Sequence, residues 1–309
     1  MAKRLACADI GSNTIKVTIA DYSGNDHFNK VLYKDFSSGL GNSLSNQNMI
    51  DQSKLADCYR ALNEIKRIIE ENNVNEYRYI ATHALREAVN QTEILSLIKS
   101  NTGIDVTVIS GEEEARLTLT AILMDFPSSK SYACINAGGG STELSFHLPG
   151  NAKTEQFYFF RFGAVNLFSD YLKDHADIET AIKKISDLAD REFKDRNIAE
   201  SLVIDDVISV GGSIYNAAYI LKKDKQRNFD DLQGMKISVS DLGSVINQLK
   251  TVNKEQKRNI TGLDNKRIET VLPGILIHYN LLKLLKKKEL VISTRTISDG
   301  LIYQMVKMK

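Results

Sequence analysis

"ACADIGSNTIKVTIA", residues 6–20, is matched 127 positions later by "ACINAGGGSTELSFH", residues 133–147. In both stretches an apolar run leads into a glycine-containing turn and then a second alternating run, which is the pattern of a β-hairpin. The alignment pairs Asp9 with Asn136 and Gly11 with Gly138. Two unrelated hairpins are the alternative, because short apolar alternations are common. We favour an internal duplication, which changes the expectation for the whole fold.

The segments that follow each hairpin support duplication. After the first hairpin the sequence predicts a strand over 29–36, a helix over 51–72, a strand over 77–82, a helix over 92–100, a strand over 105–110 and a helix from 111. After the second it predicts a strand over 155–162, helices between 165 and 196, a strand over 205–212, a helix from 213 and further helices to the C-terminus. This order predicts two α/β domains with mixed sheets and a ligand cleft between them.

The length of 309 residues also favours two domains. We place the boundary at the breaker "DFPSSKS", which gives an N-terminal domain over 1–125 and a C-terminal domain over 126–309. The last helix, about 297–309, is a candidate to pack back on the first domain.

Composition excludes several classes of protein. Forty basic and thirty-nine acidic residues leave a net charge of +1, which offers no broad field for nucleic acid or an anionic membrane. The lysine-rich run 281–290 is interpreted as the solvated end of a helix. Three cysteines fit neither a disulfide framework nor a zinc site. With no signal-peptide core and no run long enough to span a bilayer, we expect a cytoplasmic protein.

The second hairpin turn has the composition of a phosphate-binding loop. Glycines allow a ligand to approach the main chain, and consecutive amides of such a turn can converge on an anion. The predicted phosphate contacts here are Gly138, Gly139, Gly140, Ser141 and Thr142, and Glu143 is placed to hold a hydrated Mg²⁺ beside them. Tight turns use the same residues, so one such loop alone is a weak signal.

The first turn offers the same groups. Gly11, Ser12, Asn13 and Thr14 are predicted phosphate contacts, and Asp9 is a candidate metal ligand at the end of the strand. An Asx-turn, in which Asp9 bonds its own backbone, is the alternative.

Further candidate residues lie between and after the hairpins. Arg86 stands just beyond a strand, where a guanidinium could hold two phosphate oxygens. Ser110 and Glu113 have the spacing of a helix capping box, which leaves Glu114 as the surplus carboxylate and a candidate general base. Gly211, Gly212 and Ser213 open a later helix whose amides could bind a further phosphate, although close packing of strand on helix explains them equally well.

Taken together, the chain resembles the Ppx/GppA phosphatase family of exopolyphosphatases and guanosine pentaphosphate phosphohydrolases. The resembling segments are "ADIGSNT", "ATHALREAVN", "ISGEEEARL", "NAGGGSTEL", "FGAVNL" and "VGGS", in the family's order. The resemblance implies two actin-like, ribonuclease H-like domains and Mg²⁺-assisted attack of water on a terminal phosphoryl group. It puts Glu114 at the catalytic position, Asp9, Asn136 and Glu143 at the metal or phosphate site, and Arg86 on phosphate. It also implies a homodimer.

Departures from the family pattern keep other functions open. Asn136 stands where Asp is usual, Gln233 where His is usual, and Gly39 and Asn166 where Arg is frequent. Losing an acid and several cations weakens metal and polyphosphate binding together. The expected function is therefore hydrolysis of inorganic polyphosphate or of a guanosine penta- or tetraphosphate. The alternatives are a low-activity or inactive protein that senses polyphosphorylated nucleotides, and a small-molecule kinase of the actin-like superfamily.

Overall fold

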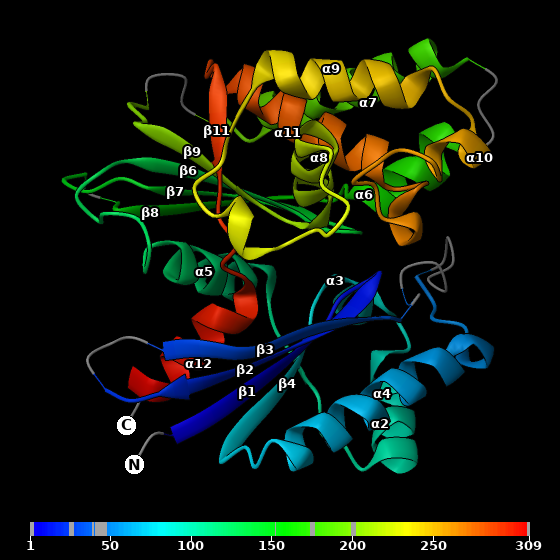
Figure 1. Cartoon of the computed structure of the whole chain (residues 1–309), viewed down its shortest axis with the longest axis vertical. Coiled ribbons are helices and arrows are strands. Elements are labelled where there is room, and N and C mark those ends of the chain that lie inside the picture. Colours follow the sequence, from blue (N-terminus) through cyan, green and yellow to red (C-terminus); the bar gives the residue numbers. More distant parts are fainter. Residues whose placement is uncertain are drawn as a thin grey trace. The chain divides into compact units, whose positions relative to one another are not determined.

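The computed structural model describes residues 3–24, 28–38, 40, 48–151, 153–173, 177–198 and 202–307 (Figure 1). The chain forms two compact units, Met1–Ala121 with Arg295–Lys309 and Ile122–Thr294. Each unit is a mixed β-sheet with helices, so the predicted α/β class is confirmed. Among the described residues no helix is both long and apolar enough to cross a membrane.

The first unit contains a sheet in the order β3-β2-β1-β4-β5. Its strands are β1 (Lys3–Ile10), β2 (Thr14–Tyr22), β3 (Phe28–Ser37), β4 (Glu76–Ala81) and β5 (Thr107–Val108). The first three form an antiparallel meander, whereas β4 and β5 run parallel to β1. The parallel strands are reached through helical crossovers, as parallel pairing requires.

Helices cover both faces of this sheet. They are α2 (Ala56–Glu71), preceded by a 3₁₀ turn at Gln52–Lys54, α3 (His83–Glu87), α4 (Gln91–Thr102), α5 (Gly111–Ile122) and α12 (Ile297–Lys307). Alternate residues of β1 point to opposite faces. Ala6 and Ala8 enter the core that contains α2 and α4, whereas Leu5 and Cys7 enter the core that contains α5 and α12.

Helix α12 packs directly on the backbone of α5. A Cβ atom built on Gly300 would lie 2.0 Å from the carbonyl oxygen of Leu117, so only glycine fits at this crossing. The last described helix therefore belongs to the core of the first unit, where it supports the helix that carries Glu114.

The second unit repeats the topology. Its sheet order is β10-β11-β9-β6-β7-β8. The strands are β6 (Tyr132–Ala137), β7 (Thr142–His147), β8 (Glu155–Phe160), β9 (Asp206–Val210), β10 (Lys236–Ser238) and β11 (Glu289–Ile292). The series β8-β7-β6-β9-β11 corresponds to β3-β2-β1-β4-β5 with the same parallel and antiparallel pairings, and β10 is added at the edge. The predicted duplication is confirmed.

The helices of the second unit surround one large apolar core. They are α6 (Ala164–Leu167), which continues into a π-helical turn at Phe168–Leu172, α7 (Ile178–Asp195), α8 (Gly212–Lys222), α9 (Val239–Lys250), α10 (Lys254–Lys257) and α11 (Val271–Leu284). Short 3₁₀ turns lie at Asp230–Leu232 and Asn265–Arg267. Helix α11 is buried along nearly its whole length, which explains its almost uniformly apolar sequence.

The expectation of helices alone after Ser213 was wrong at two places. Strands β10 and β11 interrupt the helices, and their pairing completes the sheet edge. Each strand has only three or four residues, so neither displays enough alternation to be distinguished from a helix end.

Candidate active site

The turn of the first hairpin is closed by its own backbone. The amide of Gly11 donates to the carbonyl oxygen of Thr14 at 3.0 Å. Ser38, directly after β3, binds two further carbonyl oxygens of the turn, since its amide donates to Asn13 at 3.1 Å and its hydroxyl to Gly11 at 3.2 Å. The hydroxyl of Ser12 is buried without a hydrogen-bond partner in the described part of the chain. The turn thus keeps polar hydrogen atoms for a ligand.

Asp9 lies on β1 one residue before the end of the strand, opposite Lys16 of β2. Its side chain is almost fully buried, and Lys16 Nζ is 4.0 Å from Oδ2. The other carboxylate oxygen, Oδ1, has no hydrogen-bond partner among the described residues. Burial raises the pKa of Asp9, and the charge of Lys16 opposes this only in part. An Asx-turn, which would use Asp9 to bond its own backbone, is not formed by Oδ1.

Arg86 and Glu114 form an ion pair, with Arg86 Nη1 2.8 Å from Glu114 Oε2. Arg86 lies on α3, a short helix that follows β4, so it stands just beyond a strand. Its Nη1 also donates to the carbonyl oxygen of Ile109 at 3.3 Å. The pairing between β1, β4 and β5 therefore brings together two residues that the sequence separates by 28 positions.

Of the three glutamates in the first turn of α5, only Glu114 is buried. The amide of Glu113 donates to Ser110 Oγ at 3.1 Å, as the capping-box spacing predicts, and Glu112 pairs with Arg116 at 2.9 Å. Those two acids are exposed, whereas Glu114 is 9% exposed. Burial raises the pKa of Glu114, the charge and hydrogen bond of Arg86 oppose the rise, and the negative charge of Asp9 adds to it. Asp9 and Glu114 are therefore electrostatically coupled within one unit.

The turn of the second hairpin repeats the first. The amide of Gly138 donates to the carbonyl oxygen of Ser141 at 2.9 Å, which corresponds to the Gly11 to Thr14 bond. The carbonyl oxygens of Gly138 and Gly139 accept from the amides of Ala164 and Val165 at 3.0 and 2.7 Å. The hydrogen bonds of this turn therefore hold its carbonyls on the side of α6.

The segment before α6 fixes the rest of the turn. Asn166 Nδ2 donates to the carbonyl oxygen of Gly140 at 3.0 Å, and a Cβ atom built on Gly163 would lie 2.5 Å from the backbone of Gly139. In the described part of the chain the amides of Gly139, Gly140 and Ser141 form no hydrogen bond. Successive free amides on a turn whose carbonyls are bound elsewhere make a concavity suited to an anion.

Asn136, Ser141 and Glu143 form a hydrogen-bonded cluster on the same hairpin. Asn136 Nδ2 donates to Glu143 Oε2 at 3.0 Å, and Ser141 Oγ donates to Oε1 at 2.7 Å. Glu143 is 1% exposed, so both of its oxygens already have donors in a buried position. The hydroxyl of Thr142 donates to the carbonyl oxygen of Phe162 at 2.8 Å and is likewise occupied inside the protein.

The segment Gly211, Gly212 and Ser213 leads into α8, and close packing explains two of its residues. Gly211 has φ +119°, and a Cβ atom there would lie 2.8 Å from the carbonyl oxygen of Ala137. Ser213 is buried, with its hydroxyl against Gly274 of α11, where a Cβ atom would be 1.9 Å away. Packing of strand on helix, the alternative given above, therefore accounts for Gly211 and Ser213.

Two cations beside these groups were missed from the sequence. Lys16 faces Asp9, and the guanidinium of Arg267 lies over Gly212 at the start of α8, where a Cβ atom would be 2.2 Å from Cζ. Asn216 holds the Arg267 segment in place, because its side chain donates to the Gly212 carbonyl oxygen at 2.7 Å and accepts from the Asp264 amide at 2.8 Å. The alternation of the strand could have identified Lys16, which follows the first turn, but no local pattern indicates Arg267.

Two departures from the family pattern have structural roles. Asn166 binds the second turn, as described above. Gln233 Oε1 accepts hydrogen bonds from the amide and hydroxyl of Thr294 at 2.7 and 2.9 Å. Gly39 lies outside the described residues.

Two sheets of one topology, each opened by a hairpin with the same turn, define a duplicated α/β protein of the actin-like type. The chain belongs to the Ppx/GppA phosphatase family, whose pattern matches residues 19–309.

Curated relatives are similar over part of the chain. Exopolyphosphatase 1 of Mycobacterium leprae is 26% identical over 196 residues, which are 63% of this chain and 57% of the relative. A bifunctional 3-dehydroquinate synthase/phosphatase of Fusobacterium nucleatum is 26% identical over 148 residues, or 45% of this chain and 22% of the relative. The chain thus matches little more than half the length of the exopolyphosphatase.

Solved structures match the whole chain in fold. The Aquifex aeolicus member of the Ppx/GppA family has a TM-score of 0.82 at 23% identity and covers 100% of this chain and 99% of its own. An exopolyphosphatase from Cytophaga hutchinsonii has a TM-score of 0.88 at 21% identity, with 99% and 98% coverage.

Proposed function

We propose that this protein hydrolyses the terminal phosphoryl group of inorganic polyphosphate or of a guanosine penta- or tetraphosphate, with Glu114 as the general base for water. Membership of a phosphatase family and the similarity to a protein named exopolyphosphatase support the reaction class. The buried ion pair of Glu114 with Arg86 is the observation that carries the proposal.

Glu114 has the properties that a base for water requires. A carboxylate of ordinary pKa is a weak base at neutral pH, and a raised pKa brings it closer to the operating pH. Burial supplies that rise, while Arg86 limits it and keeps the ionised form available. Arg86 uses Nη1 for Glu114, so its Nη2 remains to bind a phosphate oxygen next to the base.

The remaining phosphate contacts follow from free donors. In the second unit these are the amides of Gly139, Gly140 and Ser141. The guanidinium of Arg267 lies over Gly212 and adds positive charge at the start of α8. In the first unit the amide of Gly11 is bound within the turn, so the donors are the hydroxyl of Ser12 and the ammonium group of Lys16 beside Asp9. Phosphoryl transfer depends mainly on positioning and charge stabilisation, which such donors supply.

Asp9 fits the Mg²⁺ that we propose as cofactor, because its buried Oδ1 lacks a partner and hard oxygen ligands suit this ion. When bound, Mg²⁺ would neutralise charge on the phosphate oxygens. Glu143 and Asn136 fit less well as direct ligands because they already bind each other, so we assign them to water-mediated contact. Among the described residues no group of three or more His, Cys, Asp or Glu side chains forms a metal cluster.

A nucleotide-sensing protein with little turnover is the second candidate. Asn136 supports it, because an amide that donates to Glu143 removes one negative charge from the site that would attract a metal. Cytoplasmic location and a homodimer stay predictions, and sedimentation of the purified chain tests the second.

Phosphate release from tripolyphosphate, long-chain polyphosphate, guanosine pentaphosphate and ATP tests the proposal. Glu114→Gln should lower turnover by roughly 10²- to 10⁴-fold, the usual contribution of a general base. Glu113→Gln is the matched control, because Glu113 is exposed and neighbours the same helix cap. Equal turnover in both variants would exclude Glu114 as the base. Binding without turnover in the unaltered protein would favour the sensor.

A further inference from the structure

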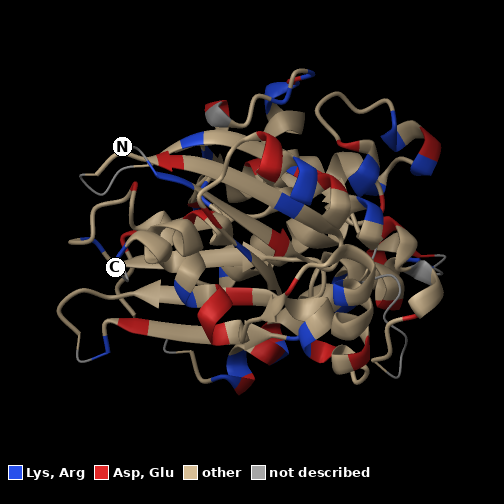
Figure 2. Ribbon diagram, turned by 90° about the horizontal axis from the view of Figure 1, so that it is seen from below, with Lys and Arg blue, Asp and Glu red and all other residues tan. Residues whose placement is uncertain are grey.

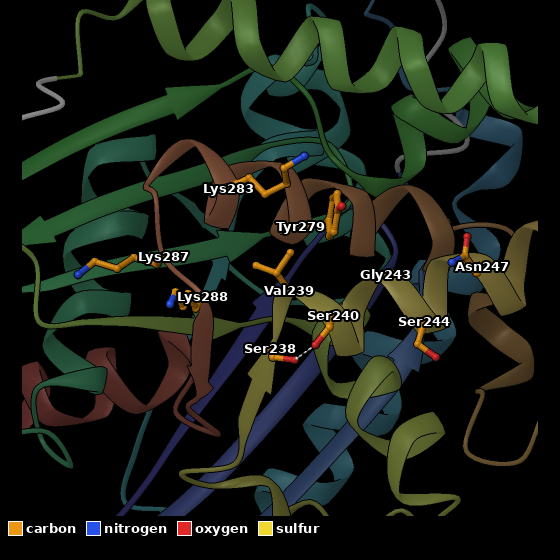
Figure 3. Close-up of a pocket in the computed structure, with 10 residues that line it drawn as sticks. All are labelled: Ser238, Val239, Ser240, Gly243, Ser244, Asn247, Tyr279, Lys283, Lys287 and Lys288. Carbon is orange, nitrogen blue, oxygen red and sulfur yellow. Dashed lines mark hydrogen bonds between the residues drawn. The ribbon is translucent and has the colours of Figure 1, made fainter.

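A groove in the second unit lies between α9 and α11 and has a volume of about 1000 Å³ (Figure 3). One wall is a face of α9 with small polar side chains and Gly243, and the other is formed by Tyr279 and Lys283 of α11. Lys287 and Lys288, which follow α11, extend the groove toward β11. Figure 3 shows the lysines toward one end and Ser244 and Asn247 toward the other.

This groove is separate from the glycine turns. Strands β6, β9 and β11 run parallel, so the N-terminal ends of these strands lie on one side of the sheet and their C-terminal ends on the opposite side. Lys288 immediately precedes β11, whereas Gly138 immediately follows β6. None of the residues that line the groove belongs to the candidate active site.

Gly243 has no packing reason to be glycine. It lies inside α9, and the nearest atom to a Cβ built there is Tyr279 Cε2 at 3.9 Å, an ordinary contact. By contrast, a Cβ atom built on the helical residues Gly274 or Gly300 would clash with a neighbouring oxygen atom at 1.9 or 2.0 Å. Glycine is unfavourable in a helix interior relative to alanine. At Gly243 its effect is to leave space beside the edge of an aromatic ring.

The lysine end of the groove carries unneutralised charge. Within the described part of the chain, no carboxylate lies at ion-pair distance from Lys283, Lys287 or Lys288. Lys287 already donates to the carbonyl oxygen of Ile204, and Lys283 Nζ lies 5.2 Å from the centre of the Tyr279 ring. Lys283 and Lys288 are therefore the cations available to an anion.

The start of α9 is capped by the protein's own side chains. Ser238 Oγ accepts from the Asp241 amide at 3.0 Å, and Asp241 Oδ2 accepts from the Ser238 amide at 2.9 Å. These bonds hold the pKa of Asp241 below its usual range. The carboxylate is thus committed to the cap.

We propose that the groove binds a nucleoside di- or triphosphate. The phosphates lie on Lys283 and Lys288, the base lies beside Tyr279 in the space above Gly243, and Asn247 and Ser244 hydrogen-bond its polar edge. A chain of phosphates alone would match the lysine end but not the neutral end with its aromatic ring. The volume is of the size found for small-molecule sites, roughly 300–1000 Å³.

Binding is tested in protein that carries Glu114→Gln, which prevents turnover from obscuring the measurement. ATP and GTP are titrated calorimetrically against this protein and against the same protein with Lys283→Gln and Lys288→Gln. A second variant, Gly243→Leu, fills the groove, and Gly243→Ala checks that α9 tolerates a side chain there. Lys194→Gln with Lys225→Gln is the matched control, because both lysines are exposed on the same unit.

The expected result is at least a tenfold weaker nucleotide affinity in the lysine variant and in Gly243→Leu, with no change in the control. Gly243→Ala should melt no lower than the parent protein. Unchanged affinity and stoichiometry in both groove variants would overturn the proposal. So would tripolyphosphate that binds the groove as tightly as the nucleotide, since this would show an anion patch without recognition of the base. A change of oligomeric state in Gly243→Leu would identify the groove as a contact between copies and overturn it as well.

Discussion

Asn136 Nδ2 lies 3.0 Å from Glu143 Oε2, at the hairpin position where the first unit has Asp9 opposite Lys16. Each hairpin therefore pairs one carboxylate with one neighbouring donor across the same register, but the acid is on the first strand in one unit and on the second strand in the other. The amide at Asn136 is thus the neutral partner of a buried acid. Acidic and basic residues are interspersed along the ribbon (Figure 2), which agrees with the net charge of +1.

Asn136→Asp should destabilise the protein in the absence of divalent metal. It removes the donor that Glu143 uses and places two carboxylates together, and loss of a hydrogen bond to a buried charge costs about 1–3 kcal/mol. Mg²⁺ should restore stability, because the two acids would then share a cation. Urea unfolding with EDTA and with Mg²⁺ measures both effects. Equal midpoints in EDTA for the variant and the unaltered protein would contradict the role given to Asn136.

Asp9→Asn should raise stability at neutral pH while removing the proposed ligand of Mg²⁺. The folded pKa of Asp9 is raised by burial, so its ionised form is disfavoured by folding. This penalty is absent below the unfolded value of about 3.9 and grows as pH rises through the folded pKa. The variant should therefore match the unaltered protein in stability near pH 4 and exceed it near pH 7. Thermal unfolding across that range tests the sign, and a constant difference would refute it.

The pH dependence of phosphate release should report on Glu114. Because its pKa is raised, activity should fall with acid at a pH above the usual glutamate value of about 4.3. Arg86 opposes the rise in the pKa of Glu114. Arg86→Gln should therefore move the acid limb of the pH–activity profile to higher pH, and it should also lower turnover. Arg86→Lys keeps the charge and should shift the limb less. A limb at the same pH in all three proteins would assign the titration to another group.

Gly300→Ala should disrupt the contact between α12 and α5. A methyl group 2.0 Å from the Leu117 carbonyl oxygen forces the helices apart, and overpacking of this kind typically costs about 1–3 kcal/mol. Because α5 carries Glu114, turnover at a temperature where the variant is folded should also fall. Gly243→Ala is the control, since a helical glycine without a close contact should gain up to about 1 kcal/mol. Destabilisation of both variants alike would show that the Leu117 contact is not the cause.

The duplication could be predicted from the sequence because its signal is local. The strand, glycine turn and strand of each hairpin form one continuous segment, 3–22 and 132–147, and Gly11 and Gly138 form the same closing bond. Strands β10 and β11 could not be predicted in this way, because their pairing depends on a partner far along the chain.

Part of the candidate site could be predicted, namely where a residue of suitable chemistry stands at a position that a local motif leaves unexplained. Glu114 stands one residue beyond a capping box, and this surplus acid proves to be buried. Its partner could not be inferred, because Arg86 reaches it only through the parallel pairing of β1, β4 and β5. Arg267 lies over Gly212 through a loop that Asn216 holds, and this arrangement leaves no local trace in the sequence.

The place of α12 has a consequence for biogenesis. The first unit takes its final helix from residues beyond Thr294, which leave the ribosome only after the whole second unit has been synthesised. Until then the apolar face formed by Leu5, Cys7 and Leu117 lacks Ile302 and Met305 as cover. The apolar surface beneath α12 therefore stays uncovered while residues 122–294 are synthesised.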